Sequence, residues 1–218
     1  MNSIVGKVYY LGSSGCAVYL VATSERYVLI DAGMSLNVLS RISDIGENLT
    51  AIGHCIITHF HIDHTATLHD LKTRVPDLKV YAHELDAFAI EEPNHDKQTA
   101  ANWYNVAYKP VALAQKFKRD SEILTIGKRE FQIIHTPGHT PGSICVLVEE
   151  DTKKILFGQD IHGPFNADFG SDLAAYQRSM QKLLDIGADI LCEGHYGIIE
   201  GKEDVRDFIL HHKRANSP

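Results

Sequence analysis

The segment Cys55-Ile56-Ile57-Thr58-His59-Phe60-His61-Ile62-Asp63-His64 guides the interpretation of the whole chain. Residues 55–58 are apolar or β-branched and predict a strand that ends at the first histidine. Side chains alternate along a strand, so His59 and His61 are expected to point to the same side. A following helical turn would direct Asp63 and His64 back toward them. Burying four such groups unpaired would be costly. Imidazoles with a carboxylate suit zinc, so the segment predicts a metal site.

Three later segments each place another metal-ligating side chain after an apolar stretch and close to glycine. They are Thr136-Pro137-Gly138-His139-Thr140-Pro141-Gly142, Phe157-Gly158-Gln159-Asp160 and Cys192-Glu193-Gly194-His195-Tyr196-Gly197. Glycine allows the backbone to turn tightly and to approach an ion. With the first segment they supply more ligands than one tetrahedral zinc ion accepts. The sequence therefore allows for two metal ions.

Strand and helix patterns alternate along both halves of the chain. Strands are predicted at residues 7–11, 17–21, 26–30, 55–58, 79–81, 111–117, 122–125, 131–134, 143–148, 154–157 and 189–192, and helices at about 36–45, 63–74, 84–90, 172–186 and 203–212. Two similar halves of this kind predict an α/β fold with two facing sheets and helices outside. Residues 1–218 are interpreted as a single domain, and the irregular stretch at about 91–110 as a lid or insert.

Composition excludes several classes of protein. Of the 218 residues, 44% are hydrophobic and 22% charged, which is typical of a globular protein. The net charge of −7 offers no general attraction to nucleic acid or anionic lipid, and neither a membrane-spanning segment nor a signal peptide is recognised. We expect a cytoplasmic protein with a small-molecule substrate and leave a homo-oligomer open. Four isolated cysteines are expected to be buried free thiols: Cys16, Cys55, Cys145 and Cys192.

These motifs, taken in order, resemble the metallo-β-lactamase superfamily. The resemblance rests on the HxHxDH segment at 59–64, Asp31-Ala32-Gly33 after an early strand, the Pro-Gly-His-Thr-Pro-Gly-Ser loop at 137–143, the late Asp160 and the late Gly194-His195. It extends from about Val8 to Ile209. It implies a four-layer αββα sandwich of two mixed β-sheets flanked by helices, with the metal site along one edge.

The resemblance also implies a role for each matching residue. The first metal would be held by His59, His61 and His139, and the second by Asp63, His64 and His195. Asp160 would bridge the two ions, and Asp31 would orient the ligand loops from behind. Both ions are expected to be divalent, with Zn²⁺ favoured and iron open.

Hydrolysis is the reaction that such a centre favours. A hydroxide shared by two zinc ions is a nucleophile near neutral pH and would attack an ester-type substrate, while Asp63 would act as the catalytic residue that orients it and carries its proton. A thioester, as in glyoxalase II-like enzymes, is the first choice of substrate. A lactone is the second, although related lactonases place a tyrosine near the bridging aspartate and this chain has Ile161-His162 there. The best-known β-lactamases carry cysteine at the position of Asp160, which argues against antibiotic hydrolysis.

A reaction of another class stays open. Mono-iron persulfide dioxygenases of the same superfamily use two histidines and one aspartate around Fe²⁺. In this chain those ligands would be His59, His139 and Asp160, with the second site empty.

The remaining histidines and aromatic residues are interpreted more simply. His162, Tyr196, Trp103 and Tyr104 are candidate substrate-pocket residues. Five other histidines are expected at surfaces or element ends, in solvated or simply hydrogen-bonded roles: His54, His69, His83, His211 and His212.

Overall fold

The first β-sheet comes from the N-terminal half of the chain. The computed structural model describes residues 2–217. Seven strands lie in sequence order: β1 (Asn2–Val5), β2 (Val8–Ser14), β3 (Cys16–Val21), β4 (Tyr27–Ile30), β5 (Ile52–Ile56), β6 (Lys79–His83) and β7 (Gln115–Phe117). Strands β1 to β4 pair antiparallel, whereas β4 to β7 pair parallel. The sheet is therefore mixed, as predicted.

The second sheet faces the first and has the order β13-β12-β11-β10-β9-β8. Its strands are β8 (Ser121–Ile126), β9 (Arg129–His135), β10 (Ile144–Glu150), β11 (Lys153–Gln159), β12 (Ile190–Glu193) and β13 (Gly197–Glu200). Only β11 and β12 pair parallel.

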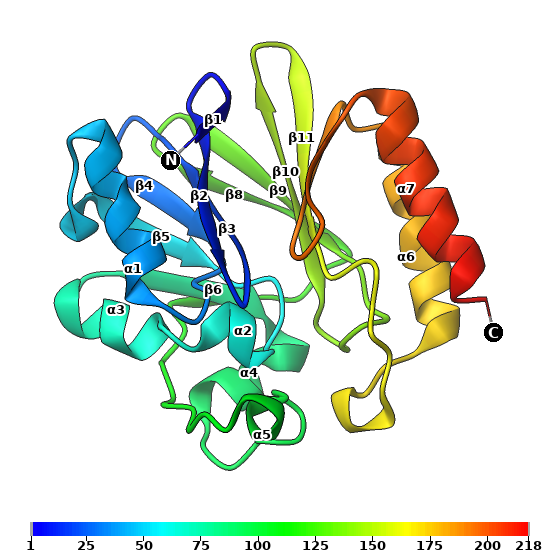
Figure 1. Cartoon of the computed structure of the whole chain (residues 1–218), viewed down its shortest axis with the longest axis horizontal. Helices are drawn as coiled ribbons and strands as arrows, with labels where there is room; N and C mark the ends of the chain where they lie inside the picture. Colours follow the sequence, from blue (N-terminus) through cyan, green and yellow to red (C-terminus); the bar gives the residue numbers. More distant parts are fainter. Residues whose placement is uncertain (1, 218) are drawn as a thin grey trace.

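Helices cover the outer face of each sheet (Figure 1). The first sheet is covered by α1 (Leu36–Leu39), a 3₁₀ segment (Ser40–Ile45), another (Leu49–Ala51), α3 (Leu68–Arg74) and α4 (Glu84–Glu91). The helical turn α2 (Ile62–Thr65) lies between β5 and α3 in the chain. The second is covered by α6 (Leu173–Ile186) and α7 (Lys202–Ala215). The short α5 (Ala101–Tyr104) lies at one end of the sandwich, and a 3₁₀ turn (Ala167–Phe169) precedes α6.

Strand β3 shows how the sequence produces these layers. All six of its residues are buried. Cys16, Val18 and Leu20 pack on the helix side of the sheet, whereas Ala17, Tyr19 and Val21 pack between the two sheets. Because side chains alternate with a period of two, a strand buried on both faces reads as a continuous apolar run. The αββα sandwich predicted from the sequence is confirmed.

Several predicted elements are corrected by the structure. The helix expected at 36–45 is one turn of α-helix followed by a 3₁₀ segment. The helix expected at 63–74 is two helices, because the Thr67 backbone N–H donates to Gly33 and its hydroxyl to Ala32 (2.6 Å). The strand expected at 111–117 shortens to β7, which joins the first sheet and not the second. Strands β1 and β13 were not predicted.

Burial confirms some expectations and corrects others. All four cysteines are free and buried. His54, His83 and His212 are buried rather than solvated. His83, at the end of β6, and His212, in the last turn of α7, do lie at element ends as expected. His54 lies inside β5 and hydrogen-bonds the Tyr81 hydroxyl at 2.8 Å. None of the helices within residues 2–217 has the length and apolar character needed to cross a bilayer.

A stacked histidine pair joins the two sheets. His83 ends β6 and His135 ends β9, and their rings lie 4.0 Å apart and nearly parallel. Burial, followed by the charge of His135, lowers the pKa of His83 to about 4. The imidazole of His83 also caps α4 by accepting the Leu85 backbone N–H.

This pair predicts acid sensitivity. Between pH 6.5 and 4, His83 is protonated in the unfolded chain but stays neutral in the folded protein, because folding lowers its pKa from 6.5 to about 4. The free energy of unfolding therefore falls as the pH decreases over this range. In the variant His83→Phe the free energy of unfolding should therefore fall less over this range than in the wild type. Denaturant titrations at a series of pH values measure this difference. Equal pH slopes for the two proteins would contradict the prediction, whatever the offset caused by the lost cap.

Candidate metal centre

The predicted ligands all lie shortly after strand ends, in loops or, for Asp63 and His64, in the helical turn α2. His59, His61, Asp63 and His64 follow β5, His139 follows β9, Asp160 follows β11 and His195 follows β12. Parallel strands end at the same edge of a sheet, which brings the loop after β5 close to Asp31 after β4, and Asp160 close to His195. The structure thereby gathers side chains that are up to 136 residues apart into one cluster.

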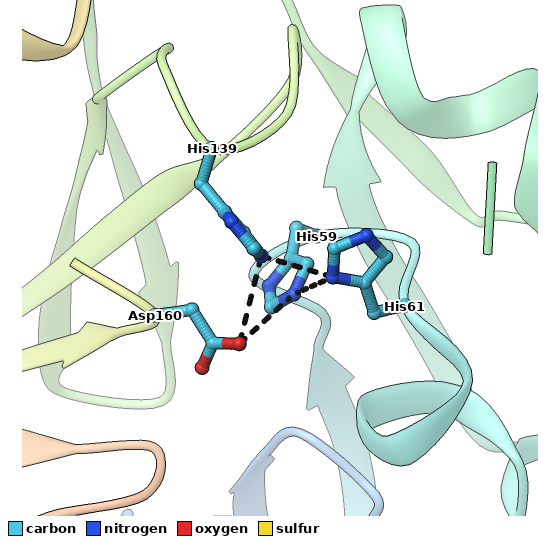
Figure 2. A group of neighbouring side chains, drawn as sticks. All are labelled: His59, His61, His139 and Asp160. Carbon is cyan, nitrogen blue, oxygen red and sulfur yellow. Dashed lines mark hydrogen bonds and ion pairs between the residues drawn. The ribbon is translucent and has the colours of Figure 1, made fainter. Parts of the chain in front are cut away.

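Three imidazoles and one carboxylate form the first ligand group (Figure 2). Nδ1 of His61 lies 3.0 Å from Nε2 of His59 and 2.9 Å from Nε2 of His139. Oδ2 of Asp160 lies 3.7 and 3.5 Å from the same atoms of His59 and His139. All four residues are buried. Their ring nitrogens therefore converge on one point.

The second ligand group shares Asp160 with the first. Its other members are Asp63, His64 and His195. Nε2 of His64 lies 3.3 Å from Oδ1 of Asp160, and Nε2 of His195 lies 3.3 Å from Oδ2 of Asp160 and 3.4 Å from Asp63. Asp160 thus lies between two groups that each provide three further side chains.

The donor set fits divalent metal ions. Within residues 2–217, Nε2 of His64 and Oδ1 of Asp160 are buried without a hydrogen-bond partner, which is costly unless another group satisfies them. Burial lowers the pKa values of His59, His61 and His139. The first group thus offers neutral imidazoles with available lone pairs, which together with carboxylates are the ligands that zinc accepts.

Two buried carboxylates hold the second group in place. Asp31 accepts the Thr58 backbone N–H and hydroxyl and contacts Nδ1 of His64 at 2.7 Å. It does so with a left-handed φ of 57°, a strained conformation that is typical of functional sites. Glu193 accepts the backbone N–H groups of His195 (2.7 Å) and Tyr196 (2.9 Å). Asp31 was predicted to act in this way, whereas the sequence reasoning missed Glu193, although it lies within the motif around His195.

A pocket of about 210 Å³ opens onto both ligand groups. Of the candidate pocket residues, Trp103, Tyr104 and His162 line it. Tyr196 is not among its lining residues; it is exposed, and its ring packs on His162 at 5.1 Å and on Phe208 at 5.4 Å. The stretch 91–110 supplies α5 and is tied to the metal loop, because Thr99 accepts the Ile62 backbone N–H.

Comparison with known sequences identifies relatives over most of the chain. The Lactamase-like protein nscB of Aspergillus fumigatus is 26% identical over 201 residues, covering 91% of this chain and 53% of the relative. The atrochrysone carboxyl ACP thioesterase of Aspergillus chevalieri is 27% identical over 187 residues, covering 85% of this chain and 52% of the relative. The chain thus spans about half the length of these curated relatives.

Solved structures and a family profile agree with the sequence relatives. A subclass B3 metallo-β-lactamase of Bradyrhizobium japonicum superposes with a TM-score of 0.79 at 20% identity, covering 98% of this chain and 90% of that one; this likeness shows the fold alone. The profile that describes the metallo-beta-lactamase superfamily matches residues 11–195, which include all seven predicted ligands. The chain therefore belongs to the metallo-β-lactamase superfamily.

Proposed function

We propose that this protein is a metal-dependent hydrolase that uses two divalent ions, with Zn²⁺ favoured, to cleave a small thioester. The observation that carries the proposal is the pair of ligand groups that share Asp160 beside an open pocket. A mono-iron dioxygenase would need only His59, His139 and Asp160. The complete second group around His64 and His195 supports the dinuclear hydrolase instead.

Seven residues would bind the metal ions, and one of them, Asp63, would also transfer a proton. His59, His61 and His139 would hold one ion, Asp63, His64 and His195 the other, and Asp160 both. When bound, two such ions supply Lewis acidity and a water of lowered pKa. Asp63 lines the pocket and its carboxylate lies 3.4 Å from Nε2 of His195, so it can hold a proton and deliver it to a leaving group there.

The walls of the pocket favour an uncharged acyl group. Trp103, Phe169 and Pro164 form an apolar side, with the Trp103 and Phe169 rings 5.1 Å apart. The pocket lining found within residues 2–217 contains no lysine or arginine, so no side chain with a permanent positive charge would pair there with a carboxylate or phosphate of the substrate. The thioesterase named among the relatives supports the same bond type.

Lactone hydrolysis is the second candidate, favoured by the position of Tyr104. Its side chain lines the pocket beside Asp63, and burial followed by the charge of Asp63 raises its pKa. The hydroxyl therefore stays protonated at neutral pH and can donate a hydrogen bond to a substrate oxygen. It would serve as the pocket tyrosine that the sequence around Asp160 does not supply.

The variant Tyr104→Phe tests this donor. We expect the turnover of the cleaved substrate to fall by roughly tenfold or more, because removing a single oxyanion donor has effects of this order or larger. Metal content should stay unchanged, since Tyr104 is in neither ligand group. Steady-state kinetics and metal analysis measure the two quantities. Undiminished turnover would show that the Tyr104 hydroxyl takes no part in the reaction.

Metal content and a substrate panel test the proposal itself. Protein purified without added metal should contain close to two zinc ions per chain and hydrolyse aryl or alkyl thioesters, or lactones, faster than anionic ones. Trp103 is the only tryptophan and lines the pocket, so its fluorescence reports ligand binding without turnover. One iron per chain, oxygen uptake with glutathione persulfide and no hydrolysis would establish the dioxygenase instead.

A further inference from the structure

Asp86 is a buried carboxylate that belongs to none of the ligand segments. It lies in the first turn of α4 and is fully buried. Its Oδ2 accepts the Phe60 backbone N–H at 3.1 Å and the Thr140 hydroxyl at 2.7 Å, and its Oδ1 accepts the Gly142 backbone N–H at 2.6 Å. Burial raises its pKa to about 7. A group that is costly to bury is thus held by three donors from two loops.

The two loops that Asp86 joins carry the first ligand group. Phe60 lies between His59 and His61, and Thr140 directly follows His139. These loops extend from opposite sheets, the first after β5 and the second between β9 and β10. No single strand ladder therefore sets the distance between them. Besides Asp86, the backbone hydrogen bond from Ile144 to Thr58 also links the two segments.

The approach of α4 to the second loop is close enough to require glycine. A Cβ atom at residue 142 would lie 2.5 Å from Oδ1 of Asp86 and 2.6 Å from its backbone nitrogen. Thr140 is held further by Ser143, whose hydroxyl accepts the Thr140 backbone N–H at 3.0 Å. The groups of the second loop that donate hydrogen bonds to the Asp86 carboxylate are therefore held in fixed positions.

The second ligand group has separate support. His64 is held by Asp31, and the loop of His195 is held by Glu193. Among the hydrogen bonds that involve residues 2–217, those of Asp86 reach neither His64 itself nor the loop of His195. Loss of its carboxylate should therefore disturb the first ligand group more than the second.

We propose that Asp86 is a positioning residue for the first ligand group: it holds the loops of His59, His61 and His139 at the separation at which these side chains bind a metal ion. It belongs to neither ligand group and does not line the pocket beside them. The inference concerns metal affinity and does not depend on which bond the protein cleaves.

The variant Asp86→Asn tests the proposal with little change of size. One carboxylate oxygen becomes an amide NH₂ that cannot accept the backbone N–H facing it. We expect the affinity for one of two Co²⁺ equivalents to fall about 10- to 100-fold, the range seen when groups that orient metal ligands are removed. The affinity for the other equivalent should fall much less, and the visible absorption of the weakened Co²⁺ site should change. Chelator competition and the Co²⁺ spectrum measure both.

Two further variants keep the test decisive. Glu84→Gln removes a neighbouring carboxylate of α4 that pairs with Lys118 at 3.5 Å, and it should leave both affinities unchanged. Thr140→Val removes one of the three donors, so it should weaken the same site, although less than Asp86→Asn does. It also keeps the proposal testable if Asp86→Asn fails to fold. Unchanged affinities in Asp86→Asn and Thr140→Val, or equal weakening of both sites in step with the stability of the metal-free protein, would overturn the proposal.

Discussion

Asp160→Ala is expected to lower the affinity for both metal ions and to reduce hydrolysis by at least about a thousandfold, since every ~1.4 kcal/mol of lost transition-state stabilisation costs tenfold. Asp160 is the only residue within 2–217 that belongs to both four-residue ligand groups. Its carboxylate lies between 3.3 and 3.7 Å from ring nitrogens of four histidines. Its removal would take one candidate ligand from each of the two groups at once.

Single-group variants provide the comparison for Asp160→Ala. His59→Ala should weaken one equivalent of metal and His195→Ala the other, because each belongs to one group. Metal analysis after dialysis, followed by activity with zinc restored, separates these patterns. The dinuclear mechanism is abandoned if His59→Ala or Asp160→Ala retains full activity, or if Asp160→Ala loses no metal.

Gly138→Ala should have the largest effect on stability among the glycine substitutions considered. A Cβ atom at this position would lie 2.5 Å from Cβ and 2.6 Å from Cα of Tyr176 in α6. Its φ of 148° is also one that L-residues rarely adopt. Overpacking of this kind costs about 1–3 kcal/mol, and backbone strain adds about 1–3 kcal/mol.

The variant Gly187→Ala serves as a control that separates the steric clash of a new Cβ atom from the backbone strain of a positive φ. Gly187 also has a positive φ, of 60°, but nothing lies within 4 Å of a Cβ placed there. Gly187→Ala should therefore cost only about 1 kcal/mol of unfolding free energy, the strain alone. Gly138→Ala should in addition weaken metal binding, because residue 138 precedes His139. Denaturant unfolding of the metal-free proteins measures the first effect, and equal losses in the two variants would contradict it.

The fold class was predictable because its signals are local. Continuous apolar runs such as residues 16–21 and 144–148 indicate strands buried on both faces. Amphipathic segments between them indicate covering helices, and α6 and α7 lie close to where they were expected. Boundaries were less predictable where long-range contacts intervene. The break before α3, for example, depends on hydrogen bonds from Thr67 to Ala32 and Gly33.

The residues of the candidate site, too, could be predicted only in part from the sequence. Its seven candidate ligand positions could be predicted from residue type, spacing and strand ends, which four short segments of sequence display. Glu193 could have been noticed beside Gly194 and His195, but nothing near Asp86 distinguishes it from an ordinary helix residue. Tyr196 was placed in the pocket by its neighbourhood in sequence, yet its ring packs against His162 and Phe208.

The layers of the fold and the residue types able to hold two metal ions could be predicted from the sequence, because alternation along strands and the chemistry of side chains are local properties. The superfamily was indicated by the resemblance of the ordered motifs. Three features became visible only in the folded chain: β7 joins the first sheet, Asp86 links residues 26 and 54 positions away, and a side chain at Gly138 would collide with α6. Those features depend on which distant segments meet. That in turn is set by the packing of whole layers and by the hydrogen bonds that buried polar groups must find.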